Sequence, residues 1–289
     1  NSLSAISGTL SNSGYGCPVT AHVPYPIVNS YQKPDPSRFK RRGTLLRQKL
    51  GIPDSSVLLC RHGAQETFNI GFAVSHVRPL ADKYPSLHFL LVNTRPAIHH
   101  PRVHNMPAVI AQHAREAYFS ACDGMYHARA DGETFGMAVG EMSLHNRPII
   151  TSTIGAQAHV KILGPKGLYY NDIPSLERGV ARLVNLGREG IHKNDWQAYK
   201  EFGLQTVMDR FDQVFIQPAL EWWQRIQELN ISDSDVWTKR PSQLPSLENA
   251  WRRGIDPAGE VRPCAHYTTD EGLPRPGRSL REAKELSFT

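Results

Sequence analysis

Short apolar runs alternate with segments of helical periodicity over residues 51–230, and this alternation constrains the fold more than any other feature of the sequence. The runs 57–60 and 87–92 are largely apolar throughout, as expected of strands that are buried on both faces of a sheet. Between them, apolar side chains recur at helical spacing. The alternation predicts an α/β fold, with a parallel sheet and helices on both of its faces.

The same patterns predict the remaining elements of this domain. We expect further strands at 108–111, 124–128, 148–152 and 168–170, and helices at 72–85, 114–121, 135–144, 173–186 and 195–215. Pro218 should interrupt the chain before a last helix that ends near residue 229. Ligands of such sheets bind at the carboxyl ends of the strands, so functional residues are expected there.

Composition divides the chain into three parts. Residues 1–24 are polar and are interpreted as a linker or the remnant of an upstream region, and residues 25–230 form the α/β domain. Residues 231–289 contain six prolines and balance nine acidic against nine basic side chains, which predicts a disordered tail. Because residue 1 is Asn and no signal segment follows, we expect an upstream domain to be missing from this sequence.

Overall composition excludes several classes of protein. Hydrophobic residues are 40% and charged residues 21%, typical of a soluble globular chain, and no apolar run approaches the roughly 18 residues of a membrane-spanning helix. The net charge of +6 fits an ordinary basic surface or phosphorylated small molecules, and we expect no nucleic-acid partner. The four cysteines have no C-x-x-C spacing, so we expect reduced thiols and a cytoplasmic protein: Cys17, Cys60, Cys122 and Cys264.

The segment 123–141 carries the strongest candidate chemistry. A strand should end near Arg129, and a helix should open near Thr134 after a glycine-containing loop. Glu133 and Glu141 are eight residues apart, a little over two helical turns, so both could lie on one helix face. Free backbone N–H groups at the helix start would suit an anionic or hydroxyl-rich ligand, and Gly136 would let it approach: these are the groups of Thr134, Phe135 and Gly136.

This segment resembles the E-x7-E motif of retaining glycosyltransferases of the GT-B fold, similar to glycosyltransferase family 4. Residues 58–63 look like the first strand and phosphate loop of the donor-binding domain, and residues 147–152 look like the strand after the motif helix. Residues 25–29 resemble the linker into that domain. The resemblance covers roughly residues 22–215 and implies a Rossmann-like domain, the C-terminal half of a divergent GT-B protein.

The resemblance also implies roles for individual residues. Glu133 would face the hydroxyls of the donor sugar, Glu141 would bind the ribose, and Arg61 would neutralise the diphosphate without a metal. The remaining donor-binding candidates are Gly63, Thr134, Phe135, Gly136, His127 and Arg129. The sequence departs from the family pattern at Glu66, where a lysine normally follows the arginine, so Arg129 or Lys161 would supply the second cation.

The implied reaction transfers a hexose from a nucleotide diphosphate sugar to an unknown glycan, lipid or protein acceptor, with no cofactor. Two alternatives stay open. A nucleotide-sugar 2-epimerase on the same fold would form product without an acceptor. A non-catalytic module that binds nucleotide sugars would explain the missing lysine.

Ordinary structural roles would account for each candidate residue as well. Glu133 could favour a helix start through the helix dipole, Glu141 could be a solvated helix residue, and Arg61 could be a surface charge. His127 could be a core histidine that satisfies its hydrogen bonds.

Other motifs are weaker. The D-x-D triplet at 233–235 lies in the polar tail with no strand before it, and Pro101 interrupts the histidine cluster at 99–104. The histidines also lack cysteine or carboxylate neighbours in the sequence, so we expect no metal site. No G-x-G-x-x-G is present, which argues against a standard dinucleotide-binding domain.

Overall fold

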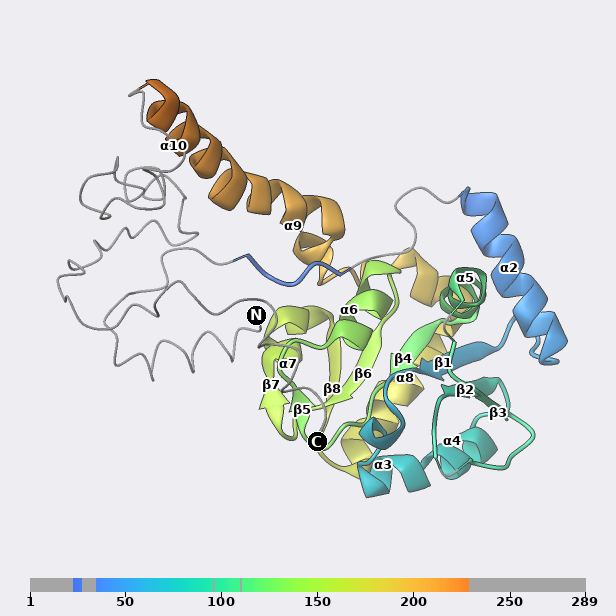
Figure 1. The fold of residues 1–289 in the computed structure, drawn as a ribbon. Coiled ribbons are helices and arrows are strands. Elements are labelled where there is room, and N and C mark those ends of the chain that lie inside the picture. Colours follow the sequence, from blue (N-terminus) through green and yellow to red (C-terminus); the bar gives the residue numbers. More distant parts are fainter. Residues whose placement is uncertain (1–22, 28–34, 96, 110, 229–289) are drawn as a thin grey trace, which may run out of the picture.

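Six parallel strands form the central sheet of the computed structural model (Figure 1). Their order across the sheet is β3-β2-β1-β4-β6-β8, and every neighbouring pair runs parallel. The strands are β1 (Val57–Arg61), β2 (Leu87–Val92), β3 (Val103–Met106), β4 (Gly124–Tyr126), β6 (Ile149–Ser152) and β8 (Gly167–Tyr170). All residues of β1 and β2 are buried, as their apolar runs predict. The predicted α/β, Rossmann-like sheet is therefore confirmed.

The structure describes residues 23–27, 35–95, 97–109 and 111–228. The tail predicted over 231–289 lies outside the described residues, as do all but the last two residues of the linker predicted over 1–24. No helix in the described ranges is both long enough and apolar enough to cross a bilayer.

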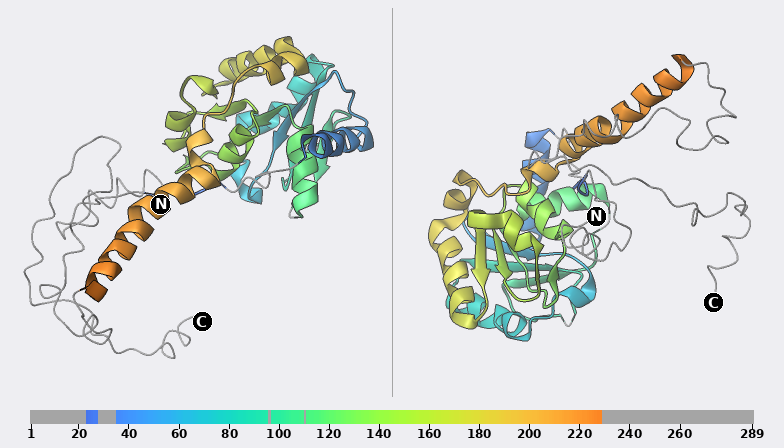
Figure 2. Two further views of the ribbon diagram at one scale, coloured as in Figure 1. Left: turned by 90° about the horizontal axis from the view of Figure 1, so that it is seen from above. Right: turned by 90° about the vertical axis from the view of Figure 1, so that its left-hand side faces the viewer.

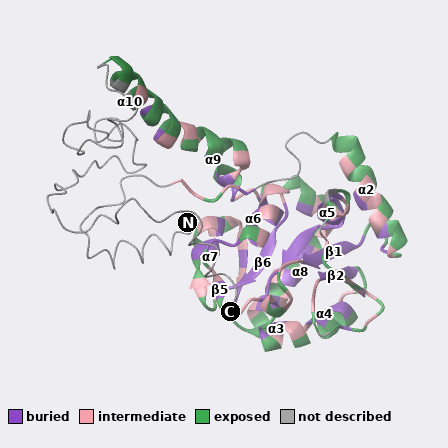
Figure 3. Ribbon diagram, in the orientation of Figure 1, coloured by how far each residue is buried: buried purple, intermediate pink, exposed green. Residues whose placement is uncertain are grey.

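Helices cover both faces of the sheet. One apolar core joins the sheet to α3 (Gly71–Ser75), α4 (Val77–Lys83) and α8 (Ile173–Lys193). The second core joins the opposite face to α5 (Gln112–Ala121), α6 (Met137–Leu144) and α7 (Ala158–Leu163), with α2 (Pro36–Lys49) packed outside α5. The strands form the buried centre between these two layers (Figure 3).

A long helical segment projects from this body. It runs through α9 (Leu204–Phe211), a π-helical turn at Asp212–Ile216 and α10 (Gln217–Glu228), and it points away from the sheet in each view (Figure 2). The interruption predicted at Pro218 is confirmed in part, because the π-helical turn Asp212–Ile216 breaks the α-helix and the proline lies in the first turn of α10. The chain changes helix type just before the proline, where the missing N–H would otherwise break the α-helical pattern.

Three other elements of the structure differ from the prediction. The third strand lies at β3 rather than at 108–111, and its mixed burial is typical of an edge strand. The helix α2 was not predicted from the polar segment that contains it, although Asp35 caps its start through the N–H of Ser37. A two-stranded parallel sheet, β5 (Gly132–Glu133) and β7 (Ala156–Gln157), was also not predicted.

The order of the strands locates a switch point between β1 and β4. The chain runs outward from β1 through β2 to β3, and then returns to lie on the other side of β1 as β4. The loops that leave the carboxyl ends of β1 and β4 therefore emerge next to each other. Crevices of this kind are where ligands bind in open α/β sheets.

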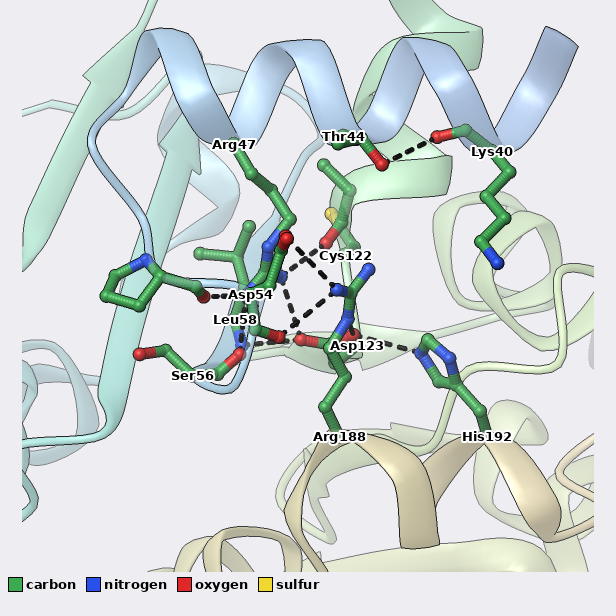
Figure 4. A network of polar contacts seen from close by, with 12 residues as sticks. Lys40, Thr44, Arg47, Asp54, Ser56, Leu58, Cys122, Asp123, Arg188 and His192 are labelled. Carbon is green, nitrogen blue, oxygen red and sulfur yellow. Dashed lines mark hydrogen bonds and ion pairs between the residues drawn. The ribbon is translucent and has the colours of Figure 1, made fainter. Parts of the chain in front are cut away.

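Asp123 lies at the opposite, amino-terminal end of β4 and is fully buried (Figure 4). Its Oδ2 accepts hydrogen bonds from Arg47 of α2 at 3.0 Å and from the backbone N–H of Leu58 at 2.9 Å. Its Oδ1 accepts from Arg188 at 3.0 Å and lies 2.9 Å from Nε2 of His192, both on α8. This carboxylate ties helices on opposite faces of the sheet to β1.

A disulfide bond joins Cys60 of β1 to Cys122, which lies two residues before β4. Because β1 and β4 are neighbours, the two Cα atoms are 5.8 Å apart, within the range that a disulfide spans. The prediction of reduced thiols is wrong for these two residues, since a separation of 62 residues gives no sequence signal. Cys17 and Cys264 lie outside the described residues.

Candidate functional site

The two candidate glutamates lie on different elements. Glu133 ends the short strand β5, whereas Glu141 lies within α6, which begins at Met137 rather than near Thr134. Gly136 precedes the helix with a φ of +84°, a left-handed conformation that glycine adopts readily, and this break delays the helix start. The prediction that both carboxylates share one helix face is therefore wrong.

Glu133 is held by two basic side chains that were also predicted site residues. Its Oε1 lies 3.2 Å from Nε2 of His127, and Arg129 contacts both carboxylate oxygens at 3.4 Å. Burial works against ionisation, but the hydrogen bond and charge of His127 and the charge of Arg129 outweigh it, so the pKa of Glu133 is lowered. Its side chain is 15% exposed. Glu133 is thus an ionised carboxylate that is still partly accessible to solvent or to a ligand.

A chain of hydrogen bonds continues behind His127. Its Nδ1 lies 2.8 Å from Oγ1 of Thr151, and the same hydroxyl lies 2.9 Å from Nε2 of His159. Thr151 lies in β6 and His159 in α7, and both are fully buried. Neither residue was a predicted site residue, because their alignment with His127 arises only when β4, β6 and α7 pack together.

Glu141 is the centre of a second cluster. Its Oε2 lies 3.0 Å from Nε2 of His62, which follows β1, and its Oε1 accepts a hydrogen bond from Arg115 of α5. The hydroxyl of Tyr118 lies 3.2 Å from Nδ1 of His62. Burial opposes ionisation here too, but the contacts with His62 and Arg115 lower the pKa of Glu141.

The partners of Glu141 were missed by the sequence analysis. His62 stands inside the segment 58–63 that carries the family resemblance, so its position after a strand was the available signal. Arg115 and Tyr118 lie on one face of α5, three residues apart, but nothing in the sequence points that face at α6.

Arg61 is buried at the end of β1 and is not the surface charge considered as an alternative. Its guanidinium donates to backbone carbonyls of Val92 at 2.9 Å, Asn93 at 2.7 Å and Ala64. It also donates to the hydroxyl of Thr67 at 2.9 Å. The predicted contact with a diphosphate stays a prediction, and forming it requires the guanidinium to release part of this carbonyl shell.

The other predicted donor-binding residues have varied surroundings. Gly63 has a φ of +143° and accepts a hydrogen bond from the side chain of Asn93 at 3.0 Å. Phe135 is buried, and its carbonyl accepts the Tyr199 hydroxyl at 2.6 Å, whereas Thr134 is exposed. Lys161, the alternative second cation, is exposed on α7.

The structure thus places two ionised carboxylates around the switch point of the sheet. His62 follows β1 and contacts Glu141, while His127 follows β4 and contacts Glu133. Each carboxylate retains partial exposure, 15% for Glu133 and 18% for Glu141. Ionised carboxylates are strong acceptors for hydroxyl groups, so the arrangement can bind a polyhydroxylated ligand.

Comparisons with known proteins find structural resemblances only. No family model matches the sequence, and no curated protein matches it. The Anabaena protein Alr3699/HepE, solved with UDP and glucose, is similar with a TM-score of 0.46 and 16% identity, over 62% of this chain and 51% of that one. A glycosyltransferase from Rickettsia africae is similar with a TM-score of 0.48 and 12% identity, over 73% of this chain and 57% of that one.

A trehalose-phosphate synthase from Burkholderia xenovorans gives a TM-score of 0.46 and 13% identity, over 66% of this chain and 50% of that one. The chain thus spans about half the length of these solved structures. With TM-scores below 0.5, the resemblances add nothing to what the parallel sheet itself establishes about the fold.

Proposed function

We propose that this chain is the donor-binding part of a retaining glycosyltransferase of the GT-B type, which transfers a hexose from a nucleotide diphosphate sugar to an acceptor. The observation that carries the proposal is the pair of ionised, partly exposed glutamates beside the switch point, in the order of the E-x7-E motif. We propose that the reaction needs neither a metal nor a further cofactor.

Glu141 binds the ribose of the nucleotide in this proposal. The two hydroxyls of a ribose can both donate to one carboxylate, and the contacts with His62 and Arg115 hold the Glu141 side chain in one orientation. A fixed acceptor loses little entropy when the ligand binds.

Glu133 faces the sugar that is transferred. Its contacts with His127 and Arg129 are long, 3.2 and 3.4 Å, so its oxygens keep capacity for sugar hydroxyls. A negative charge beside the anomeric carbon also stabilises the positive charge that develops there when the glycosidic bond breaks. Arg129 is the nearest candidate for the second cation.

Replacing each glutamate by glutamine tests this assignment. Glu141→Gln should weaken binding of both UDP and UDP-glucose by about 10- to 150-fold, because a charge-assisted hydrogen bond is lost. Glu133→Gln should weaken UDP-glucose in this range and leave UDP almost unchanged. GDP and GDP-mannose form a parallel pair of ligands, and calorimetry measures all four affinities.

Glu177→Gln is the matched control, since Glu177 lies on α8 and pairs with His76 and Lys83 away from both clusters. It should change no affinity. If the wild-type chain binds none of the four ligands, or if both site variants bind as the wild type does, the proposed function is wrong.

A non-catalytic binding module is the second candidate, and one observation favours it. The guanidinium of Arg61 is occupied by carbonyls and Glu66 stands where the family has a lysine, so the diphosphate has less positive charge to stabilise its departure. An enzyme should release UDP from bound UDP-glucose, and faster when a suitable acceptor is added, whereas a binding module should release none. Measuring UDP with and without candidate acceptors separates the two.

A further inference from the structure

A single hydroxyl hydrogen lies between two buried imidazole rings. Oγ1 of Thr151 is 2.8 Å from Nδ1 of His127 and 2.9 Å from Nε2 of His159. A threonine hydroxyl can donate only one hydrogen bond, so one of these two ring nitrogens must carry a hydrogen and donate to it. The states of the two histidines are therefore not independent.

With His159 neutral, two arrangements satisfy this chain and the ionised Glu133. In the first, His127 is neutral, its Nε2–H donates to Glu133, Thr151 donates to its Nδ1, and His159 donates from Nε2 to Thr151. In the second, His127 carries hydrogens on both nitrogens, Thr151 turns to donate to Nε2 of His159, and His159 carries its hydrogen on Nδ1. A neutral His127 with the hydrogen on Nδ1 would set a lone pair against the carboxylate, which is unfavourable.

We propose that Thr151 and His159 are positioning residues that join the protonation of His127, the partner of the ionised Glu133, to a change of tautomer in His159. The proton balance is simple. One proton is taken up, His127 gains a hydrogen at Nδ1, and His159 loses one at Nε2 and gains one at Nδ1. The charge of His159 does not change, and Thr151 keeps one hydrogen throughout.

The surroundings of the two rings support this assignment. Burial and, to a smaller extent, the charge of His127 lower the pKa of His159 to about 4, although Glu133 and the backbone of Ser152 and Ala156 oppose the shift. A neutral His159 can respond to a change at His127 only by a change of tautomer. Its Nδ1 is buried and makes no hydrogen bond within the described part of the chain, so the hydrogen bond with Thr151 is what distinguishes the two tautomers of the ring.

The charged and titratable groups around His127 come from β5, α7, β8 and the loop after β4. Glu133 on β5 contacts its Nε2, Arg129 in the loop reaches it through Glu133, and His159 on α7 faces it across Thr151. The hydroxyl of Tyr170 on β8 donates to its backbone carbonyl. While His127 is neutral, the negative charge of Glu133 is paired with Arg129 alone among these groups and is more available to the donor sugar. Protonation of His127 pairs that charge, so affinity for the sugar should fall. This last step rests on the proposed function, whereas the joined titration does not.

Long-range nitrogen-15 NMR of the histidine rings tests the joined titration in the full chain without any ligand. Signals are assigned by their loss in His127→Gln and His159→Gln, and the wild type is titrated from about pH 8 to pH 5. As His127 takes up its proton, the pattern of His159 should change from Nε2–H to Nδ1–H at the same midpoint. A tautomer of His159 that ignores the titration of His127 overturns the proposal.

Two substitutions of Thr151 identify the hydroxyl as the link. Thr151→Ser retains the hydroxyl and should keep the joined titration. Thr151→Val has nearly the same shape without the hydroxyl, and His159 should then keep one tautomer across the midpoint of His127. If the two rings still respond together in Thr151→Val, the proposed relay from His127 through Thr151 to His159 is wrong. Melting curves check that both variants are folded.

Calorimetry across the same pH range tests the link to the donor. Affinity for UDP-glucose should fall by about fivefold as His127 is protonated, while affinity for UDP stays level. If the NMR shows the joined titration but donor affinity does not follow it, the relay stands and the proposed role of Glu133 is wrong. If donor affinity depends on Glu133 but the NMR shows no joined titration, the relay is wrong and the proposed function stands.

Discussion

The two ends of β4 carry the same types of side chain and put them to different uses. Asp123 lies at the amino end, and His127 at the carboxyl end contacts Glu133. Both carboxylates contact a histidine and an arginine. Asp123 is fully buried and receives four contacts of 2.9–3.0 Å, whereas Glu133 is 15% exposed and has contacts of 3.2–3.4 Å. A carboxylate with all its lone pairs occupied can only hold the fold, while one with spare capacity can also bind a ligand.

We call the amino end of β4, with Asp123, the closed end and the carboxyl end, with Glu133, the open end. The largest expected effect on stability is at the closed end. Asp123→Asn leaves Arg47 buried without its countercharge, and breaking such a buried pair costs about 3–5 kcal/mol in the free energy of unfolding. Urea unfolding of both proteins measures the difference. A loss below about 1 kcal/mol would show that Asp123 is not needed to hold α2 and α8 on the sheet.

The disulfide strengthens the same end, since Cys122 is the residue before Asp123 and its partner Cys60 lies two residues after Leu58. Replacing both cysteines by alanine should lower the free energy of unfolding by about 2 to 4 kcal/mol, because the unfolded chain regains the freedom that the cross-link removed. Glu133 contacts neither cysteine, whereas Cys60 directly precedes Arg61 and His62, so the ratio of the affinities for UDP-glucose and UDP should change little. A loss of UDP-glucose affinity relative to UDP as large as that of Glu133→Gln would contradict the separation of the two ends.

Acid should act on the closed end through Asp123. Burial raises the pKa of this carboxyl, but the contacts with His192, Arg47 and Arg188 outweigh burial and lower it. A carboxyl with a lowered pKa stabilises the fold above its unfolded value of about 3.9, and this contribution is lost as the pH falls through its folded pKa. Melting temperature should therefore fall more steeply below about pH 4 in the wild type than in Asp123→Asn. Parallel curves for the two proteins would rule out this contribution.

The smallest expected effect on stability is at the open end. Arg129 is 33% exposed and contacts Glu133 at 3.4 Å, so Arg129→Gln should cost less than about 1 kcal/mol of stability. Under the proposed function it should nevertheless weaken UDP-glucose, because a cation near the diphosphate is lost. A cost in stability comparable to that of Asp123→Asn would mean that both ends of β4 serve the fold.

Burial explains which parts of the fold could be predicted. The runs at β1 and β2 are apolar because both faces of the sheet cover them, so sequence alone identifies them. The edge strand β3 contains Val103 but also His104 and Asn105, and its polarity hid it. The start of α6 was misplaced because apolar periodicity extends through Phe135, while the left-handed backbone at Gly136 breaks the helix there.

The candidate site was predicted only from the two segments that resemble a motif, 58–63 with Arg61 and Gly63, and 123–141. Glu133, Glu141, His127 and Arg129 lie within a stretch of 15 residues, and its resemblance to a motif brought them together. Thr151 and His159 join the first cluster through packing of β6 and α7, and Arg115 joins the second through packing of α5. Contacts between distant segments leave no regular spacing in a single sequence.

The bond between Cys60 and Cys122 also gives the chain a closed covalent ring, with two open arms leaving it. The ring contains β2, β3 and α5, together with the loop after β1 that carries His62. A protease that cuts once inside the ring opens it but releases no fragment, so the nicked chain migrates as one band on electrophoresis. The same sample separates into two bands once a reductant is added, whereas a cut in either arm separates in both conditions. The pattern of bands thus maps any cleavage site to the ring or to an arm before sequencing.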